Sequence, residues 1–450
     1  MADQLTEAKT ADGRNISWEE HLVDDQDLGE VRLRGATALA TADLDKDGIP
    51  DVISAYQGSS HVRVAFGSDD PGTWFRLSLA EGAEALGVSD LAIEDLNGDG
   101  YPDLIAASEG HLLYLQNPGG RTHNHTVRGW RWDRVIPPVT KGRGAYSRVW
   151  FADLNDDGSF EVVAVSALGT RGEGPAVAQA EGVVSWFEPG ADPLNPEGWQ
   201  QHVLARVNAP LAAGSADLDG DGDIDVFAVT GGEQSVLWFE NLGGLPVTFQ
   251  AHAGTLEMPA GGSLQPSSSH LAFHDFNANG RLDVVFGDTP TSIAWLEQPA
   301  DASGSWTLHA IGSIAPDQVA DLTLADVTGD EQPDVIVGSA SQGPHEEDGE
   351  SITPAEPVGR IAWFENPGSA SGNWKRHDVS RRARGRFGAF ALLDLDEDGD
   401  LDLLGTRAGS GGLDGVFWLE KLHSTEPATV FTPAREKESK SLPLPGGSPE

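Results

Sequence analysis

The stretch that decides the fold is Asp217-Leu-Asp-Gly-Asp-Gly-Asp-Ile-Asp225, which is followed by an apolar run at 226–229. Its carboxylates stand at alternate positions, glycine allows a tight turn, and a last acid precedes the apolar run. Carboxylate oxygens arranged in this way can surround a hard cation such as Ca²⁺, which takes about six to eight oxygen ligands. The stretch therefore predicts a cation-binding turn that leads into a β-strand.

The same stretch is repeated along the chain. Seven copies begin at Asp43, Asp95, Asp153, Asp217, Asp275, Asp326 and Asp394. Their spacing of roughly 50–70 residues is near that of propeller blades with four strands each. Apolar segments precede and follow each copy, and an aromatic segment such as Trp363-Phe-Glu comes next. The clearest copies end with Trp-x-x-His, as at Trp199 and Trp306. The sequence thus predicts an all-β, seven-bladed β-propeller of four-stranded blades.

The two ends of the chain complement each other. No Trp-x-x-His segment follows the seventh repeat, whereas Trp18-Glu-Glu-His-Leu-Val23 precedes the first one. We therefore expect the N-terminal segment to complete the last blade and close the ring, which would remove the open sheet edges. The propeller should span 15–423, between a flexible N-terminus at 1–14 and a disordered tail at 424–450, which is rich in Ser, Pro, Lys and Glu. Two insertions, 167–182 and 339–358, read as long surface loops.

These repeats resemble the FG-GAP/VCBS repeat of integrin-α-type seven-bladed β-propellers. The resemblance rests on Asp-x-Asp-x-Asp-Gly-x-x-Asp before a strand and on Trp363-Phe-Glu-Asn-Pro-Gly368 downstream, and it covers nearly all of 15–423. It implies Ca²⁺ loops on the lower face of a ring and ligand loops on the upper face. The Trp-x-x-His repeats are also similar to the propeller part of aldos-2-ulose dehydratase-type proteins.

Positions 1, 3, 5 and 9 of each acidic loop are the predicted metal ligands, with Ca²⁺ as the expected structural ion and Mg²⁺ as the alternative. They are Asp43, Asp45, Asp47, Asp51; Asp95, Asn97, Asp99, Asp103; Asp153, Asn155, Asp157, Glu161; Asp217, Asp219, Asp221, Asp225; Asp275, Asn277, Asn279, Asp283; Asp326, Thr328, Asp330, Asp334; and Asp394, Asp396, Asp398, Asp402. Twenty-three of these side chains are acids, whose mutual repulsion a divalent ion would offset. The fifth loop has two acids, and the sixth has Glu331 in place of glycine, so these two can instead be metal-free turns.

Histidines fall into two groups. His21, His202, His309 and His377 recur at the Trp-x-x-His position, which predicts an architectural role. His123 and His125 alternate in a way that could bind a metal, although a solvated loop is the favoured explanation. Five residues before each loop, the chain places Ala38, Asp90, Arg148, Ala212, His270, Asp321 and Ala389. The ionisable members would surround the mouth of the central channel, as a functional site or as a satisfied buried polar network.

Two functions of different classes remain open. The first is a calcium-stabilised binding module, whose glycan or protein ligand would contact upper-face loops. The second is a sugar lyase or dehydratase that works by β-elimination, with a base that removes a proton and a cation that steadies the enolate. The catalytic candidates for the second are Tyr146, Arg148, His270, His61 and His111. The ligand-binding candidates for the first are Asp90, Asp321, Arg34, Arg143 and Arg386.

The loops between repeats are basic, whereas the acidic loops lie on the opposite face. Arg34, Arg143, Arg381, Arg382 and Arg386 lie in these basic segments. They predict a positive upper mouth that attracts an anionic ligand such as a carboxylate-bearing sugar, with a solvated surface as the alternative.

Composition limits the remaining possibilities. The net charge of −42 argues against nucleic acid or an anionic membrane as a partner of the whole surface. No stretch is apolar and long enough to span a bilayer, and the first residues have no signal-peptide pattern. We expect a soluble protein, either cytoplasmic or a mature secreted form. The absence of Cys leaves the redox compartment open, and the oligomeric state stays open as well.

Overall fold

β-Strands make up nearly all of the regular structure, and the helical elements are short 3₁₀ turns. The computed structural model describes residues 4–119, 127–129, 131–168, 181–208, 210–230, 236–257, 264–267, 270–301, 304–341, 343, 345, 348, 352–353, 356–369, 372–409, 412–435, 440 and 442. No helix in these ranges has the length and apolar character needed to cross a bilayer. The predicted all-β class is confirmed.

Four sheets have four strands each, in sequence order. The first two consist of β2 (Ala36–Ala42), β3 (Asp51–Tyr56), β4 (His61–Phe66) and β5 (Phe75–Glu81), and of β6 (Asp90–Glu94), β7 (Asp103–Ser108), β8 (His111–Gln116) and β9 (Asp133–Val135). The other two consist of β10 (Ala145–Ala152), β11 (Glu161–Leu168), β12 (Glu181–Glu188) and β13 (Gln200–Asn208), and of β22 (Gln318–Ala325), β23 (Asp334–Ala340), β24 (Val358–Glu365) and β25 (Lys375–Ala383).

Two further four-stranded units share an outer edge, because β17 and β21 pair in parallel. They consist of β14 (Pro210–Ala216), β15 (Asp225–Thr230), β16 (Val236–Asn241) and β17 (Phe249–Glu257), and of β18 (Ala272–His274), β19 (Asp283–Thr289), β20 (Ser292–Glu297) and β21 (Ser305–Ser313). The last sheet joins β26 (Arg386–Leu393), β27 (Asp402–Ala408) and β28 (Gly415–Ser424) to β1 (Asn15–Asp25) and β29 (Phe431–Thr432).

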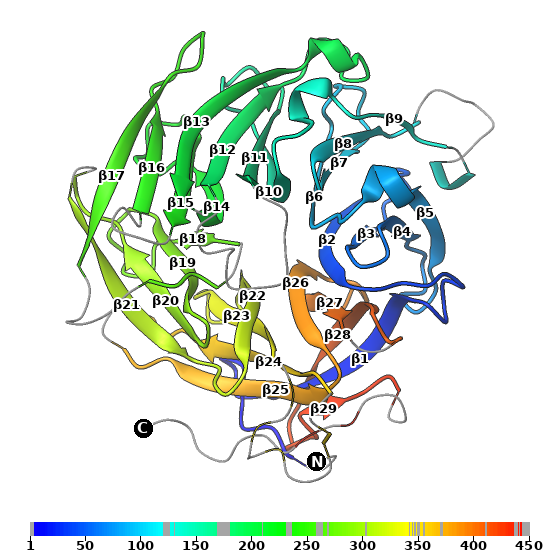
Figure 1. The fold of residues 1–450 in the computed structure, drawn as a ribbon. Coiled ribbons are helices and arrows are strands. Elements are labelled where there is room, and N and C mark those ends of the chain that lie inside the picture. The colour runs from blue at the N-terminus through cyan, green and yellow to red at the C-terminus, as the bar shows by residue number, and fades with distance from the viewer. Residues whose placement is uncertain are drawn as a thin grey trace.

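Figure 1 shows the sheets arranged around a common centre, with the first strand of each one innermost. Each acidic loop connects the first strand of a sheet to the second, as between β2 and β3, where Ala42 pairs with Asp51. Apolar side chains of neighbouring sheets pack between them; Ile53 and Val64, for example, share a cluster with Leu104 and Leu113. This radial stacking of small antiparallel sheets is the architecture of a β-propeller.

Strand β1 pairs with β28 along its whole length. The antiparallel register runs from Asn15 opposite Ser424 to Asp25 opposite Gly415. The ring of His21 stacks on Trp418 with centroids 4.3 Å apart. Other sheets have the same stack between their last two strands, as between Trp295 and His309 at 4.1 Å. The N-terminal strand therefore occupies the place of a fourth strand.

The segment after β28 packs on the propeller. β29 pairs in parallel with β1, and the backbone of residue 430 accepts a hydrogen bond from the N–H of Trp18 at 2.9 Å. Leu442 is 1% exposed and packs with Val358 and Ala383. The expectation of a structureless tail is wrong for the described residues of 424–450, because Phe431 and Leu442 find apolar contacts that composition does not reveal.

The same holds for the N-terminus. Leu5 forms a bridge with Thr429, and Ala8 is 7% exposed in a core cluster. The expected flexibility of 1–14 is therefore wrong for the described residues from 4 onward. Some predictions concern residues outside the described ranges. They are the loop predicted to hold His123 and His125, and most of the insertions at 167–182 and 339–358.

Candidate functional site

The first aspartate of each acidic loop organises the turn by accepting backbone hydrogen bonds. Asp43 accepts from the N–H groups of Asp47 and Gly48 at 3.1 and 3.0 Å. Asp217 accepts from Gly220 and Gly222 at 2.8 and 3.1 Å. These hydrogen bonds fix the shape of the turn. One oxygen at positions 3 and 5 is used in the same way in this loop, since Asp219 accepts from the N–H of Asp221 and Asp221 accepts from the N–H of Asp223.

The acid at position 9 links the loop to its own sheet. Asp225 Oδ2 accepts from the N–H of Leu218 at 3.1 Å, and its Oδ1 accepts from Asn241 at 2.7 Å. Burial raises the pKa of Asp225 to about 7, although these hydrogen bonds work in the opposite direction. Burial likewise raises the pKa to about 7 at the other six position-9 acids, which are Asp51, Asp103, Glu161, Asp283, Asp334 and Asp402. A nearby cation would lower the free energy of the ionised form.

Carboxylate oxygens converge within 4.8 Å of one another in three of the loops. The converging sets are Asp43, Asp45 and Asp51; Asp217, Asp219 and Asp221; and Asp394, Asp396 and Asp398. Asp45 Oδ1 and Asp394 Oδ1 are buried and have no hydrogen-bond partner among the described residues, which is costly for a carboxylate unless it meets a cation. All-oxygen donor sets of this kind suit Ca²⁺ or Mg²⁺. The residues present therefore fit the predicted ion.

The carboxylates of the Asp217 loop are the least compensated by positive charge. Burial raises the pKa of Asp219, and the neighbouring carboxylates of Asp221, Glu240 and Asp217 raise it further. Among the described residues, no Lys or Arg pairs with Asp217, Asp219 or Asp221. In the sixth loop, by contrast, Asp326 accepts from three successive backbone N–H groups, and Glu331 has φ 68°, where other loops place glycine.

The innermost strands bring four ionisable side chains together at the centre of the ring, as the sequence phase predicts. Arg148 Nη1 lies 2.9 Å from Asp90 Oδ2, and His270 Nε2 lies 3.9 Å from Asp90 Oδ1. His270 Nδ1 lies 2.8 Å from Asp321 Oδ1. Because Asp90 is on β6 and Asp321 is on β22, His270 links sheets that are far apart in the sequence.

The two aspartates of this central cluster are buried and held by the backbone. The N–H of Val149 donates to Asp90 at 2.9 Å, and the N–H of Ala389 donates to Asp321 at 2.8 Å. Burial acts to raise the pKa of Asp321, but the charge and hydrogen bond of His270, together with Arg386, outweigh it and lower the pKa. The cluster is a largely satisfied ion-pair network, the alternative that the sequence left open.

The other catalytic candidates lie apart from this cluster. Tyr146 is 2% exposed and donates its hydroxyl hydrogen bond to the carbonyl of Thr140 at 3.0 Å; burial raises its pKa. His61 and His111 contact the carbonyls of Ser59 and Glu84 at the starts of β4 and β8. In the described part of the chain, these three side chains form no hydrogen bond or ion pair with His270.

The predicted basic mouth is wrong for two of its arginines. Arg381 and Arg382 lie in β25 with 0% exposure. Arg381 pairs with Asp317 at 3.1 Å, and Arg382 pairs with Glu20 at 2.6 Å. Their charges are compensated inside the protein, so they do not attract a ligand.

The remaining candidates for anion binding are dispersed. Arg34 and Arg143 are exposed, and Arg143 donates to the carbonyl of Val139 at 3.1 Å. Arg386 donates to the carbonyl of Ala320 at 2.9 Å, beside the central cluster. These positions do not form one basic surface.

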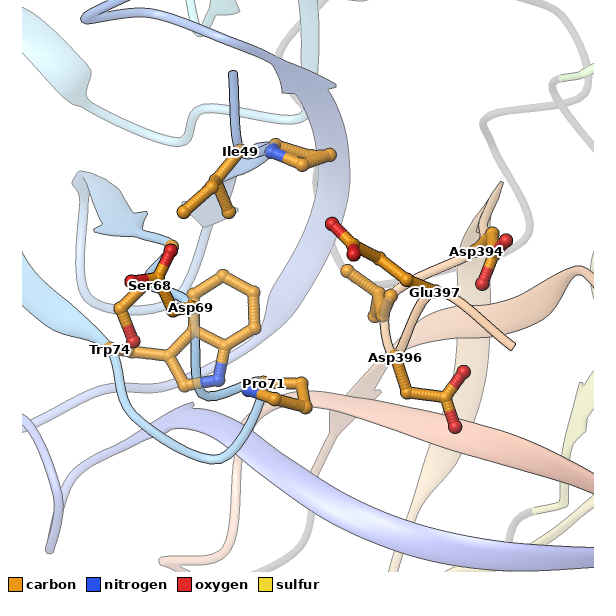
Figure 2. A pocket seen from close by; sticks show the side chains of 11 residues that line it. Ile49, Ser68, Asp69, Pro71, Trp74, Asp394, Asp396 and Glu397 are labelled. Atoms are coloured by element: carbon orange, nitrogen blue, oxygen red, sulfur yellow. The ribbon is translucent and has the colours of Figure 1, made fainter. Parts of the chain in front are cut away.

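A cavity of about 150 Å³ lies between the seventh acidic loop and the segment that follows β4. Figure 2 shows the side chains that line it. Trp74 and Asp69 lie on one side, and Asp394, Asp396 and Glu397 lie on the other. Ile49, Pro50 and Pro71 add apolar surface, and no Lys or Arg lines the cavity. The indole N–H of Trp74 has no hydrogen-bond partner among the described residues. The sequence analysis missed this site because its two walls are more than 300 residues apart.

Histidines at the outer strands are architectural, as predicted. His202 stacks on Trp186 at 3.8 Å, and His377 stacks on Trp363 at 4.2 Å. His377 also pairs with Glu365 at 2.8 Å. These stacks explain why Trp-x-Glu and Trp-x-x-His recur together.

The chain was compared with protein-family models, with curated proteins and with solved structures. The model of the FG-GAP-like repeat matches residues 43–106, 95–164 and 275–337. Among solved structures, the chain is similar to a lectin of Agrocybe aegerita that recognises non-reducing terminal N-acetylglucosamine. The identity is 17%, the TM-score is 0.45, and the match covers 79% of this chain and 82% of the lectin. A search of the curated proteins found no match.

Sheets around a centre and acidic loops in their first hairpins define the chain as a β-propeller. Each family match begins at the first aspartate of an acidic loop, namely Asp43, Asp95 and Asp275. Three segments of this β-propeller thus match the FG-GAP-like repeat. The resemblance to aldos-2-ulose dehydratase-type proteins is not tested by these matches and stays a prediction.

The central cluster predicts a stability effect. His270→Ala removes the partner of buried Asp321 and should lower the free energy of unfolding by about 1–3 kcal/mol, because a buried carboxylate loses a charge-assisted hydrogen bond. Urea unfolding followed by tryptophan fluorescence measures the change. His61→Ala is the control outside the cluster, and equal midpoints for both variants and wild type would contradict the network.

Proposed function

We propose that this protein is a calcium-stabilised β-propeller that binds a glycan or protein ligand. The observation that carries the proposal is the cavity beside Trp74. Trp74 lines this cavity although it is only 7% exposed, and the carboxylates that line the cavity can accept hydrogen bonds from hydroxyl groups of a ligand. Because Asp69, Asp396 and Glu397 would repel an anion, the cavity favours a neutral glycan over the anionic one expected from the sequence.

This proposal moves the ligand away from the upper mouth. The side chains of the central cluster pair with one another, so few of their hydrogen-bonding atoms are left for a ligand. These side chains are Asp90, Arg148, His270 and Asp321. The cavity instead lies beside an acidic loop, and its walls come from two neighbouring sheets. A ligand there would also be sensitive to whether the seventh loop holds an ion, since Asp394 and Asp396 serve both sites.

The proposed fold is a closed ring of seven blades. Its support is the order of the sheets and the pairing of β1 with β28. The proposed ion is Ca²⁺ at the loops, with the Asp217 loop as the strongest site; Mg²⁺ remains the alternative ion. When bound, the ion would supply charge compensation to the carboxylates of each loop.

The lyase alternative draws less support. It needs a base and an enolate-stabilising cation at one point, yet Tyr146 is buried and His61 and His111 lie outside the central cluster. His270 and Arg148 are each paired with an aspartate. A binding module requires none of these groups to be free.

Binding can be tested with an array of neutral, amino and acidic glycans in the presence of Ca²⁺. We expect retention of neutral glycans and about tenfold weaker binding by Glu397→Gln, since one charged hydrogen bond contributes roughly 1.5–3 kcal/mol. The matched control is Phe75→Ala, next to Trp74 but 51% exposed and outside the cavity lining. Unchanged affinity of Glu397→Gln for a retained glycan would remove the cavity as the binding site.

A further inference from the structure

Among the described residues, the first acidic loop differs from the others in that an arginine from the neighbouring sheet pairs with two of its carboxylates. Arg128 lies in η2 (Val127–Gly129), between β8 and β9, and reaches the loop between β2 and β3. Its Nε lies 2.5 Å from Asp45 Oδ2, and its Nη2 lies 2.5 Å from Asp47 Oδ2. The same Nη2 donates to the carbonyl of Gly67 at 3.2 Å.

The setting of Arg128 favours a lasting contact. Its guanidinium lies over the ring of Phe66, 5.3 Å from the centroid. Burial acts to lower the pKa of Arg128, but Asp45 and Asp47 outweigh this and raise it. The side chain is 28% exposed, which shields these ion pairs from much of the solvent that weakens surface pairs.

Arg128 takes oxygens that a bound cation would need. Asp47 Oδ1 accepts from the N–H of Ile49 at 2.9 Å, and its Oδ2 contacts Arg128, so both oxygens are occupied. At the same position of the Asp217 loop, Asp221 Oδ1 accepts from Asp223, and no described residue bonds to Oδ2. The two loops have the same acids at positions 1, 3, 5 and 9, but among the described residues only the first loop has an arginine bonded to them.

We propose that Arg128 is the built-in counter-cation of the first acidic loop, and that it competes with a divalent ion for the oxygens of Asp45 and Asp47. Entry of the ion displaces the guanidinium and so breaks a bond between the sheets β2–β5 and β6–β9. Asp43, Asp45 and Asp51 still converge on the inner side of the loop, where Asp45 Oδ1 has no partner. The first loop is therefore the weak, exchangeable ion site and the Asp217 loop the strong one; this inference rests on the proposed binding of Ca²⁺.

Arg128→Gln tests the competition by calorimetric titration of the chelator-stripped protein with Ca²⁺. We expect one site to bind Ca²⁺ about tenfold or more tightly, because the ion no longer displaces charge-assisted bonds. Arg128→Lys keeps the charge and should stay near wild type. The gain should vanish in Arg128→Gln combined with Asp47→Asn, which assigns it to the first loop.

An unchanged or weaker affinity in Arg128→Gln would overturn the proposal, since it would mean that Arg128 is neutral toward the ion or supports it. The proposed binding of Ca²⁺ has its own measurement in Asp217→Asn, which should lose one tight site whether or not Arg128 competes. If the titrations of wild type and of Asp217→Asn give equal, negligible heats of Ca²⁺ binding, calcium binding at the Asp217 loop is rejected. If Arg128→Gln binds Ca²⁺ tenfold more tightly while Asp217→Asn titrates like wild type, the competition by Arg128 stands. Only the assignment of a strong site to the Asp217 loop would then be rejected.

Discussion

Stripping the protein of divalent ions with a chelator should lower its melting temperature by on the order of 10 °C. An ion present at about 100 times its dissociation constant stabilises the folded state by roughly 2.7 kcal/mol per site. A protein of this length gains about 0.9 kcal/mol/K of unfolding entropy, so three occupied loops give a shift of this size. The three loops with converging carboxylates, which begin at Asp43, Asp217 and Asp394, set that number.

Differential scanning calorimetry with Ca²⁺, with Mg²⁺ and with chelator measures the shift. Asp217→Asn should remove a part of the Ca²⁺-dependent stability. The matched control is Asp275→Asn in the fifth loop, because Asp275 also accepts two backbone hydrogen bonds, from Asn279 and Gly280. The two variants lose the same kind of turn bond but differ in the expected ion. The same melting temperature with and without chelator would refute the calcium proposal.

Repetition made the fold predictable from the sequence. The acidic stretch sets a phase, and counting five residues back from it identified Asp90, Arg148, His270 and Asp321, which the structure brings together. Side chains alternate along a strand, but the catalytic candidate Tyr146, two residues before Arg148, does not join this cluster. A bulge between Tyr146 and Arg148 breaks that alternation, and Tyr146 packs in the apolar core instead.

Burial of charge was the main feature that the sequence did not predict. The sequence around Arg381 and Arg382 is typical of a basic loop. In the fold, Asp317, Asp348 and Glu20 pair with these two arginines, although they are distant from them in the sequence. His252 was missed for a smaller reason. Its strand begins with Phe249 in place of Trp, although His252 stands beside Trp238 and Glu240 as the other histidines do.

The second large effect concerns β1. Deleting residues 1–25 should leave the protein unable to fold as a stable monomer, because the whole edge of β28 loses its hydrogen-bonded partner. Two buried ion pairs are lost as well, Glu20 with Arg382 at 2.6 Å and Asp24 with Arg63 at 2.6 Å. Each leaves an arginine buried without its partner, at a cost of about 3–5 kcal/mol. Together these losses exceed the stability of many domains.

A rescue variant separates loss of the strand from loss of chain length. Asn15 lies opposite Ser424, so a short turn can join the end of β28 to the start of β1 as a regular hairpin. This permuted chain begins after residue 25, ends with residues 15–25 and omits 1–14 and 425–450; a chain of residues 15–424 in their natural order is its control. Size-exclusion chromatography should show aggregates for the deletion and monomers of matching stability for the permuted chain and its control. A soluble deletion variant that melts with wild type would show that β1 does not hold the last sheet together.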